Sequence, residues 1–244
     1  MIGVGTMKTG VLGIHGFTGG PYEIQPFVDY LQEHTDWKIV VPTLPGHGET
    51  LELKNVTAES WMMAAEQSLH QLQKEVDRVI IVGFSMGGII ALYLANRYPV
   101  HKLVLLSAAA KYIYPSQLLQ DIKDIVKEAI AGKLGENPIY KQYSYKIKRT
   151  PIPATLEFMR LVRIVQPYYG QITVPVYIVQ GKKDGIVPYA TAQFIYDEIG
   201  SLKKEIVYSE IGKHHICYSE DCQDWFNTTL HFLSEEKEED TTSN

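Results

Sequence analysis

Six short runs of apolar and β-branched residues recur along the chain, and each is too continuously apolar to have one face in water. The runs lie at Thr9–Ile14, Lys38–Val41, Arg78–Val82, Leu103–Leu106, Val174–Val179 and Glu205–Tyr208. Between most of them lie longer segments with apolar residues every three or four positions, the period of an amphipathic helix. These segments are Pro21–His34, Thr57–Val76, Met86–Arg97, Tyr189–Ile199 and Ser219–Leu233. The alternation predicts an α/β fold, a mainly parallel sheet with helices on both faces.

The alternation is interrupted between residues 111 and 170, where no run typical of a sheet strand occurs. A segment of this length is too long for a structureless loop, and Ser116–Ala131 and Thr155–Val165 both carry apolar residues at helical spacing. We therefore predict a helical cap at residues 111–170, inserted into a core formed by residues 1–110 and 171–234. The acidic end, residues 235–244, is predicted to be a disordered tail.

Composition excludes several classes of protein. Of the 244 residues, 45% are hydrophobic and 21% are charged, which is typical of a soluble globular protein. No apolar run reaches the roughly 18 residues that a membrane span needs, and no signal-peptide pattern opens the chain, so we expect a cytoplasmic location. A net charge of -5 gives no basic footprint for nucleic acid. Cys217 and Cys222 fit neither a redox pair nor a zinc site and are interpreted as free thiols.

The segment Gly83-Phe84-Ser85-Met86-Gly87 joins the third apolar run to a predicted helix. A turn this tight between strand and helix holds its central residue in a strained conformation and excludes bulky neighbours two positions before and after it. The serine hydroxyl then stands exposed above the sheet edge. The pattern predicts Ser85 as a nucleophile, and a passive serine in a glycine-rich turn is the alternative.

A serine hydroxyl is a weak nucleophile at neutral pH, so it requires a base and an acid that orients the base. Asp184 follows the fifth apolar run and precedes a helix, and the pair His214-His215 follows the sixth. The order nucleophile, acid, base is the one expected for a sheet whose site lies at the carboxyl ends of its strands. The residues alone leave open which imidazole is the base. Three other carboxylates are interpreted as surface groups: Asp197, Asp221 and Asp224.

The first apolar run is followed by His15-Gly16-Phe17-Thr18-Gly19-Gly20. The backbone N–H groups of Phe17 and Met86 are predicted to form an oxyanion hole. A phosphate-binding loop is the rival interpretation, but the segment has neither GxGxxG nor a closing Lys-Ser/Thr. The glycines therefore indicate a site for acyl chemistry rather than for a nucleotide.

With these motifs the chain resembles the α/β-hydrolases, and more closely the small cytosolic bacterial carboxylesterases and monoacylglycerol lipases. The resemblance rests on HGFTGG at 15–20, PGHG at 45–48, GFSMGG at 83–88 and D-x-x-V-P from Asp184. In that family the base precedes an aliphatic residue, so the resemblance favours His215, which precedes Ile216, over His214. The antiparallel strands that open the sheet in that family have almost no room before Thr9, so about six or seven strands are expected.

The resemblance implies a serine hydrolase acting on short- to medium-chain acyl esters, monoacylglycerols among them, through an acyl-enzyme on Ser85 and without metal or cofactor. The alternatives are a thioesterase or C–C hydrolase with the same triad, or a ligand receptor that turns over slowly. Four residues are predicted to contact the substrate: Phe17, Met86, Leu156 and Met159. Residues 110–173 hold ten Lys/Arg against five Asp/Glu. We hypothesise transient contact between the cap and anionic lipid surfaces, with solvated surface lysines as the alternative.

Overall fold

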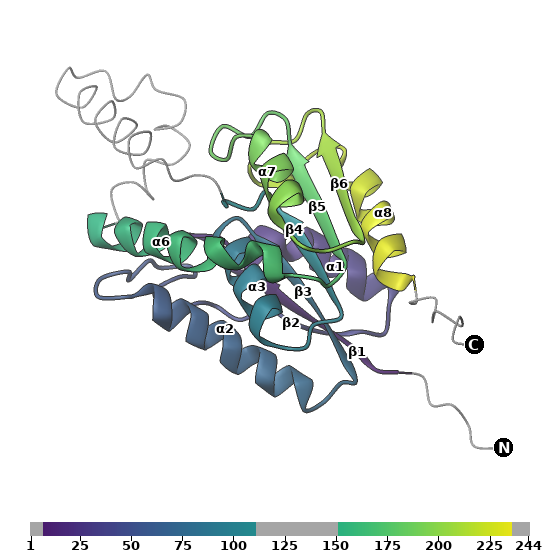
Figure 1. Cartoon of the computed structure of the whole chain (residues 1–244), viewed down its shortest axis with the longest axis horizontal. Coiled ribbons are helices and arrows are strands. Elements are labelled where there is room, and N and C mark those ends of the chain that lie inside the picture. The colour runs from purple at the N-terminus through teal and green to yellow at the C-terminus, as the bar shows by residue number, and fades with distance from the viewer. Residues whose placement is uncertain (1–6, 111–150, 236–244) are drawn as a thin grey trace.

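The computed structural model describes residues 7–110 and 151–235, and a six-stranded sheet runs through its centre (Figure 1). The strands are β1 (Thr9–Ile14), β2 (Lys38–Val40), β3 (Arg78–Phe84), β4 (Lys102–Leu106), β5 (Val176–Gly181) and β6 (Lys204–Ser209). Their order is β2-β1-β3-β4-β5-β6, and every neighbouring pair is parallel. The predicted parallel sheet is confirmed, and within the described ranges it has six strands.

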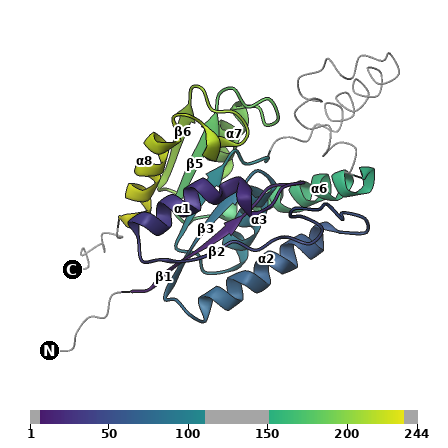
Figure 2. The same cartoon turned by 180° about the vertical axis from the view of Figure 1, so that it is seen from behind.

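Helices cover both faces of the sheet, as predicted. The α-helices are α1 (Gln25–His34), α2 (Ala58–Gln73), α3 (Met86–Arg97), α6 (Ile152–Val165), α7 (Ala190–Glu198) and α8 (Cys222–Ser234). Short 3-10 helices occur at η1 (Pro21–Ile24), η3 (Gln166–Gln171) and η4 (Ile216–Tyr218). One apolar core joins the sheet to α1 and α8, which lie across the face shown in Figure 2. The other core joins the opposite face to α2, α3, α6 and α7.

Successive strand residues alternate between these two cores. In β1, Val11 belongs to the core with α1 and α8, whereas Leu12 and Ile14 belong to the core with α2 and α3. All six residues of β1 are buried, so neither face of this strand meets water. This double burial explains why the strand is an unbroken apolar run rather than an alternating one.

Local signals in the sequence fix several helix ends. Thr57 caps α2: its side chain accepts a hydrogen bond from the N–H of Ser60, and the Ser60 hydroxyl accepts one from the N–H of Thr57. Pro21 opens a 3-10 turn that leads into α1, because its fixed φ suits a first helical position. Each of these helices therefore starts within a few residues of its predicted position.

The last part of the predicted cap is α6, which begins at Ile152, earlier than expected, and packs against α2 and α3. Its Glu157 accepts a hydrogen bond of 3.0 Å from the N–H of Ala58 at the start of α2. Arg160 of α6 also pairs with Glu59 of α2. These contacts bind the described end of the predicted cap to α2 of the core. The remaining cap residues, 111–150 with the predicted helix Ser116–Ala131, and the tail beyond 235 lie outside the described residues.

Candidate active site

Ser85 stands between the end of β3 and the start of α3 with φ 53° and ψ -115°. Positive φ is rare for a residue with a Cβ and costs of order 1–3 kcal/mol, so the surroundings must hold it there. The backbone supplies this hold: the N–H of Ser85 donates to Leu106 O at 2.9 Å, and its carbonyl accepts from Gly88 and Ala109. Ser85 therefore has the strained strand-to-helix geometry that the sequence predicted.

The glycines around Ser85 are required by close packing of the backbone. A Cβ at Gly83 would overlap the carbonyl of Gly87, and a Cβ at Gly88 would overlap the Cβ of Ala108. A Cβ at Gly87 would overlap the carbonyl oxygens of Ile14 and His15 at the end of β1. The start of α3 is thus pressed against the loop that follows β1.

His214 lies between Ser85 and Asp184. Its Nε2 is 3.1 Å from Ser85 Oγ, and its Nδ1 is 2.9 Å from Asp184 Oδ2. The carboxylate accepts the proton on Nδ1, which leaves the lone pair of Nε2 facing the serine hydroxyl. Ser85 and His214 are each 7% exposed, so the three side chains form a nearly dry, hydrogen-bonded line. This is the geometry of a nucleophile, its base and an orienting acid.

Asp184 is held as a carboxylate. Its Oδ1 accepts the N–H groups of Ile186 and Val187, both at 2.8 Å, and its Oδ2 accepts from Gln180 Nε2 at 3.0 Å. Burial on its own would raise the pKa of Asp184, but the hydrogen bond and charge of His214 and the two backbone N–H groups lower it below the ordinary value. The acid therefore stays ionised and fixes the tautomer of the imidazole.

The prediction that His215 faces Ser85 is wrong. Its Nε2 lies 3.3 Å from Glu23 Oε1, on the other side of the loop, and its ring stacks on Phe84 at 5.7 Å. Adjacent residues project in different directions, so only one of the pair can point at the serine. The imidazole that faces Ser85 belongs to His214, and the residue after it is His215 rather than an aliphatic one.

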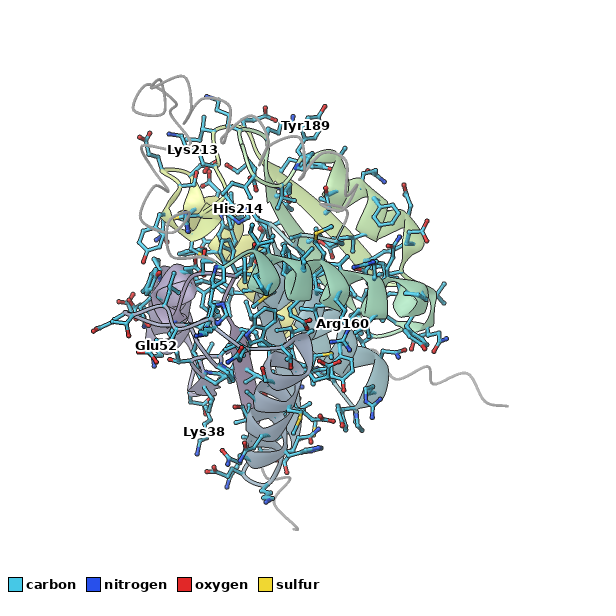
Figure 3. The ribbon with its side chains drawn as sticks, turned by 90° about the vertical axis from the view of Figure 1, so that its left-hand side faces the viewer. Lys38, Glu52, Arg160, Tyr189, Lys213 and His214 are labelled. Carbon is cyan, nitrogen blue, oxygen red and sulfur yellow. The ribbon has the colours of Figure 1, made fainter. Side chains whose placement is uncertain are left out.

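The loop after β6 is bound to the loop after β5, and this contact aims His214. Lys183 N–H donates to Gly212 O at 2.9 Å, and a Cβ at Gly181 would overlap the Gly212 carbonyl. Figure 3 shows the consequence for two neighbours: Lys213 lies at the rim, whereas His214 is set among the interior side chains.

The two predicted oxyanion donors lie on the segments that meet beside Ser85. Met86 is the first residue of α3, where a helix leaves its N–H groups without intrahelical acceptors. Phe17 follows the end of β1, against which Gly87 is packed. The structure brings these two segments together beside the serine, and an oxyanion hole formed by their N–H groups stays a prediction.

The side chain of Phe17 belongs to an aromatic cluster with three other rings. It stacks on Phe158 of α6 at 5.3 Å and meets Trp61 and His47 edge-on at 5.7 and 5.9 Å. Of the other predicted substrate contacts, Met86 and Met159 are buried, at 0% and 5% exposure, whereas Leu156 is 52% exposed. Phe158, which no sequence motif indicated, is thus a residue of α6 that contacts the ring of Phe17.

Two further residues were missed, Glu23 and Gln180, both buried to 2% exposure or less. The signal for Glu23 in the sequence is a glutamate two positions after a Gly-Gly-Pro helix start; its burial is seen only in the structure and requires a partner for the carboxylate. Within residues 7–110 and 151–235 no cluster of three or more acidic, histidine or cysteine side chains is arranged to hold a metal ion. No helix in those ranges is long and apolar enough to cross a membrane.

The chain is similar to several known hydrolases. The profile of the family Hydrolase_4, described as serine aminopeptidase S33, matches residues 5–221. A thermostable monoacylglycerol lipase of Bacillus sp. (strain H-257) is 29% identical over 81% of this chain and 79% of its own. A carboxylesterase of Bacillus subtilis (strain 168) is 24% identical over 84% of both chains. A structure reported for the metagenome-derived lipolytic enzymes LipS and LipT has a TM-score of 0.75 at 21% identity, covering 93% of this chain and 94% of its own.

Proposed function

Because the chain belongs to the Hydrolase_4 family (serine aminopeptidase, S33) and is an α/β-hydrolase enzyme, we propose that it cleaves carboxylic esters through an acyl-enzyme on Ser85. The observation that carries the proposal is the continuous line from Ser85 Oγ through His214 to Asp184, with separations of 3.1 and 2.9 Å. We assign the base to His214, in place of the His215 that the sequence favoured.

In the proposed reaction Ser85 Oγ attacks the ester carbonyl while His214 Nε2 takes its proton. Asp184 stabilises the imidazolium, and the N–H groups of Phe17 and Met86 receive the negative charge that develops on the carbonyl oxygen. His214 then returns the proton to the departing alcohol. Water attacks the acyl-enzyme as the same imidazole takes its proton, and His214 then returns that proton to Ser85 Oγ as the acid is released.

For the substrate we propose short- to medium-chain acyl esters, including monoacylglycerols. The partly exposed ring of Phe17, packed against the buried rings of Phe158 and Trp61, provides an apolar, aromatic wall next to the oxyanion loop, and such walls bind acyl chains rather than charged groups. The relatives named as a monoacylglycerol lipase and a carboxylesterase support the same class. We also propose transient contact of the predicted cap, residues 111–170, with anionic lipid surfaces, and a cytoplasmic location.

The test is steady-state hydrolysis of nitrophenyl acetate, butyrate, octanoate and palmitate, of a monoacylglycerol, of a thioester and of an amino-acid nitroanilide. We expect multiple turnovers on the esters, fastest at an intermediate chain length, with little cleavage of the nitroanilide. Ser85→Ala should abolish both turnover and labelling by a fluorophosphonate. Rapid cleavage of the nitroanilide without hydrolysis of the esters would identify a peptidase instead. Labelling of Ser85 by the fluorophosphonate without turnover of any substrate would favour a receptor.

A further inference from the structure

Glu23 is a carboxylate buried against the loop that carries Phe17. Its side chain is 2% exposed, and its Oε2 accepts the N–H of Gly16 at 2.9 Å. A Cβ at Gly19 would overlap this carboxylate, so the loop from Gly16 to Gly19 wraps closely around it. A buried charge is costly unless it is paired and hydrogen-bonded. The hydrogen bond to Gly16, and not apolar packing, therefore accounts for a carboxylate at this buried position.

The peptide that presents the Phe17 N–H is held at its neighbouring polar groups. Gly16 O, which belongs to the same peptide unit as the Phe17 N–H, lies 2.9 Å from His15 Nδ1. His15 Nε2 accepts the N–H of Leu44 at 3.0 Å, so its proton is on Nδ1 and is donated to Gly16 O. Glu23 holds Gly16 on its other side through the N–H. These two bonds together fix the direction in which the Phe17 N–H points.

Glu23 is also tied to the loop that carries the base. His215 Nε2 lies 3.3 Å from Glu23 Oε1, and the hydroxyl of Tyr218 donates to Tyr22 O at 2.6 Å. Two polar contacts therefore join the start of η1 to the residues that follow His214. The exposed fraction of the His215 side chain is 27%, so the pair with Glu23 lies at the inner edge of the surface.

We propose that Glu23 is a positioning residue for the oxyanion hole, and that His215 acts on the same hole through Glu23. Adjacent histidines then serve opposite sides of the reacting carbonyl: His214 contacts the nucleophile, and His215 steadies the oxyanion loop. The inference rests on the proposed function, because it assigns the Phe17 N–H to the oxyanion. It adds two residues that do not contact substrate to the machinery of the site.

The expected effect is smaller than the loss of a donor. Removing one oxyanion-hole donor lowers kcat by roughly a hundred- to a thousandfold. Without Glu23 the Phe17 N–H remains, and the bond from His15 to Gly16 O still restrains its peptide. We therefore expect Glu23→Leu, which has similar size but accepts no hydrogen bond, to lower kcat about ten- to a hundredfold with KM changed less than about threefold. Glu23→Gln keeps an oxygen for Gly16 and should restore most of the loss.

The readout that separates positioning from general damage is the affinity for an alkylboronic acid. Its tetrahedral adduct on a serine mimics the oxyanion, whereas the ground-state substrate does not. Across wild type, Glu23→Leu and Glu23→Gln, the inhibition constant should rise by the same factor by which kcat/KM falls. A Glu23→Leu enzyme that is slow but binds the boronic acid as wild type does would overturn the proposal.

Two matched pairs extend the test without removing the carboxylate. His215→Phe keeps the ring but loses the contact with Glu23, and should lower kcat about three- to tenfold, whereas His215→Gln places an amide near the same spot and should recover it. In the double variant with Glu23→Leu, His215→Phe should add nothing further. Gly19→Ala displaces the carboxylate and should imitate Glu23→Leu, whereas Gly185→Ala, where a Cβ meets open space, should leave kcat unchanged.

The proposed function and this inference fail in different ways. A wild type that turns over no ester and whose Ser85 takes no fluorophosphonate refutes the former. Because phosphonylation also builds charge on an oxygen in the oxyanion hole, its rate tests the positioning role even where no ester is turned over. Full kcat and full labelling rate in Glu23→Leu, Gly19→Ala and His215→Phe would refute the inference alone.

Discussion

Replacing His214 and His215 by alanine, one at a time, separates the two imidazoles by their distance from the nucleophile. His214 Nε2 is 3.1 Å from Ser85 Oγ, whereas His215 Nε2 is engaged with Glu23, and the two rings are 5.8 Å apart. Proton transfer needs a heavy-atom separation of about 2.6–3.2 Å, which His214 Nε2 meets, whereas His215 Nε2 is directed at Glu23. The remaining imidazole should not replace the missing one.

The expected magnitudes differ by several orders. Loss of the catalytic histidine from subtilisin, a serine hydrolase with the same kind of triad, lowers kcat by about a millionfold, or about 8 kcal/mol of barrier. We expect His214→Ala to approach this value. His215→Ala should lose about tenfold or less, since it acts through Glu23. Stability should fall little in His214→Ala, because Asp184 keeps its bonds to Ile186 and Val187 when His214 is removed.

The assay is kcat/KM on nitrophenyl butyrate, with the melting temperature and far-UV circular dichroism of each purified variant as the control for folding. A single-turnover burst measurement separates acylation of Ser85 from deacylation. A folded His214→Ala enzyme that keeps more than about 1% of the wild-type kcat/KM, beside a His215→Ala enzyme at background, would refute the assignment of the base.

The same contacts lead to three more expected outcomes. Asp184→Asn should lower kcat by roughly 10⁴. Because the folded-state pKa of Asp184 lies below its unfolded value, the stability that its carboxylate contributes is present above about pH 4 and disappears in more acid solution. The difference in melting temperature between wild type and Asp184→Asn should therefore shrink below that pH. Gln180→Leu removes a hydrogen bond to the Asp184 carboxylate and should lower kcat about tenfold with little change in KM, which steady-state kinetics will show. Phe158→Ala should cost about 3 kcal/mol in urea unfolding and shift the preferred ester toward longer chains, whereas Leu156→Ala on the exposed side of α6 should change stability by less than about 0.5 kcal/mol.

The sheet and most helix ends were predictable because each is determined by local sequence. The run Thr9–Ile14 forms β1 with the predicted bounds, since both faces of that strand are buried and every residue must be apolar or small. Ser85 was predictable for a related reason, because the crowding of Gly83 and Gly87 leaves a sequence signature that few other turns require.

The choice between His214 and His215 was not predictable from local sequence. It depends on how far the loop after β6 travels before it returns to the serine, and on where a partner for the second imidazole lies. Glu23, the partner of His215, precedes it by 192 positions in the sequence. A preference for an aliphatic residue after the base carries no information about such a contact, and so it selected the member of the pair that faces Glu23 rather than Ser85.

The register of the sheet sets the distances that these loops must span. Val82 of β3 aligns with Val104 of β4, Val104 aligns with Tyr177 of β5, and Tyr177 aligns with Glu205 of β6. Parallel strands lie about 4.8 Å apart, so β5 is roughly 10 Å and β6 roughly 14 Å from β3, the strand that precedes Ser85. His214 must therefore lie more residues beyond the end of its strand than Asp184 does, since β6 is farther from the serine than β5.

This requirement explains why the loop after β6 is bound to the loop after β5 rather than extending freely. Asp184 must reach the serine across two strand spacings and His214 across three. A loop of that length without contacts of its own would not fix the orientation of the imidazole. The bond from Lys183 N–H to Gly212 O and the close approach of Gly181 to Gly212 fasten the longer loop onto the shorter one. These contacts fix the position of His214 relative to Asp184, and through Asp184 relative to the serine. One residue added between Gly212 and His214 would carry the imidazole past its acid, although every strand and helix of the fold would remain in place.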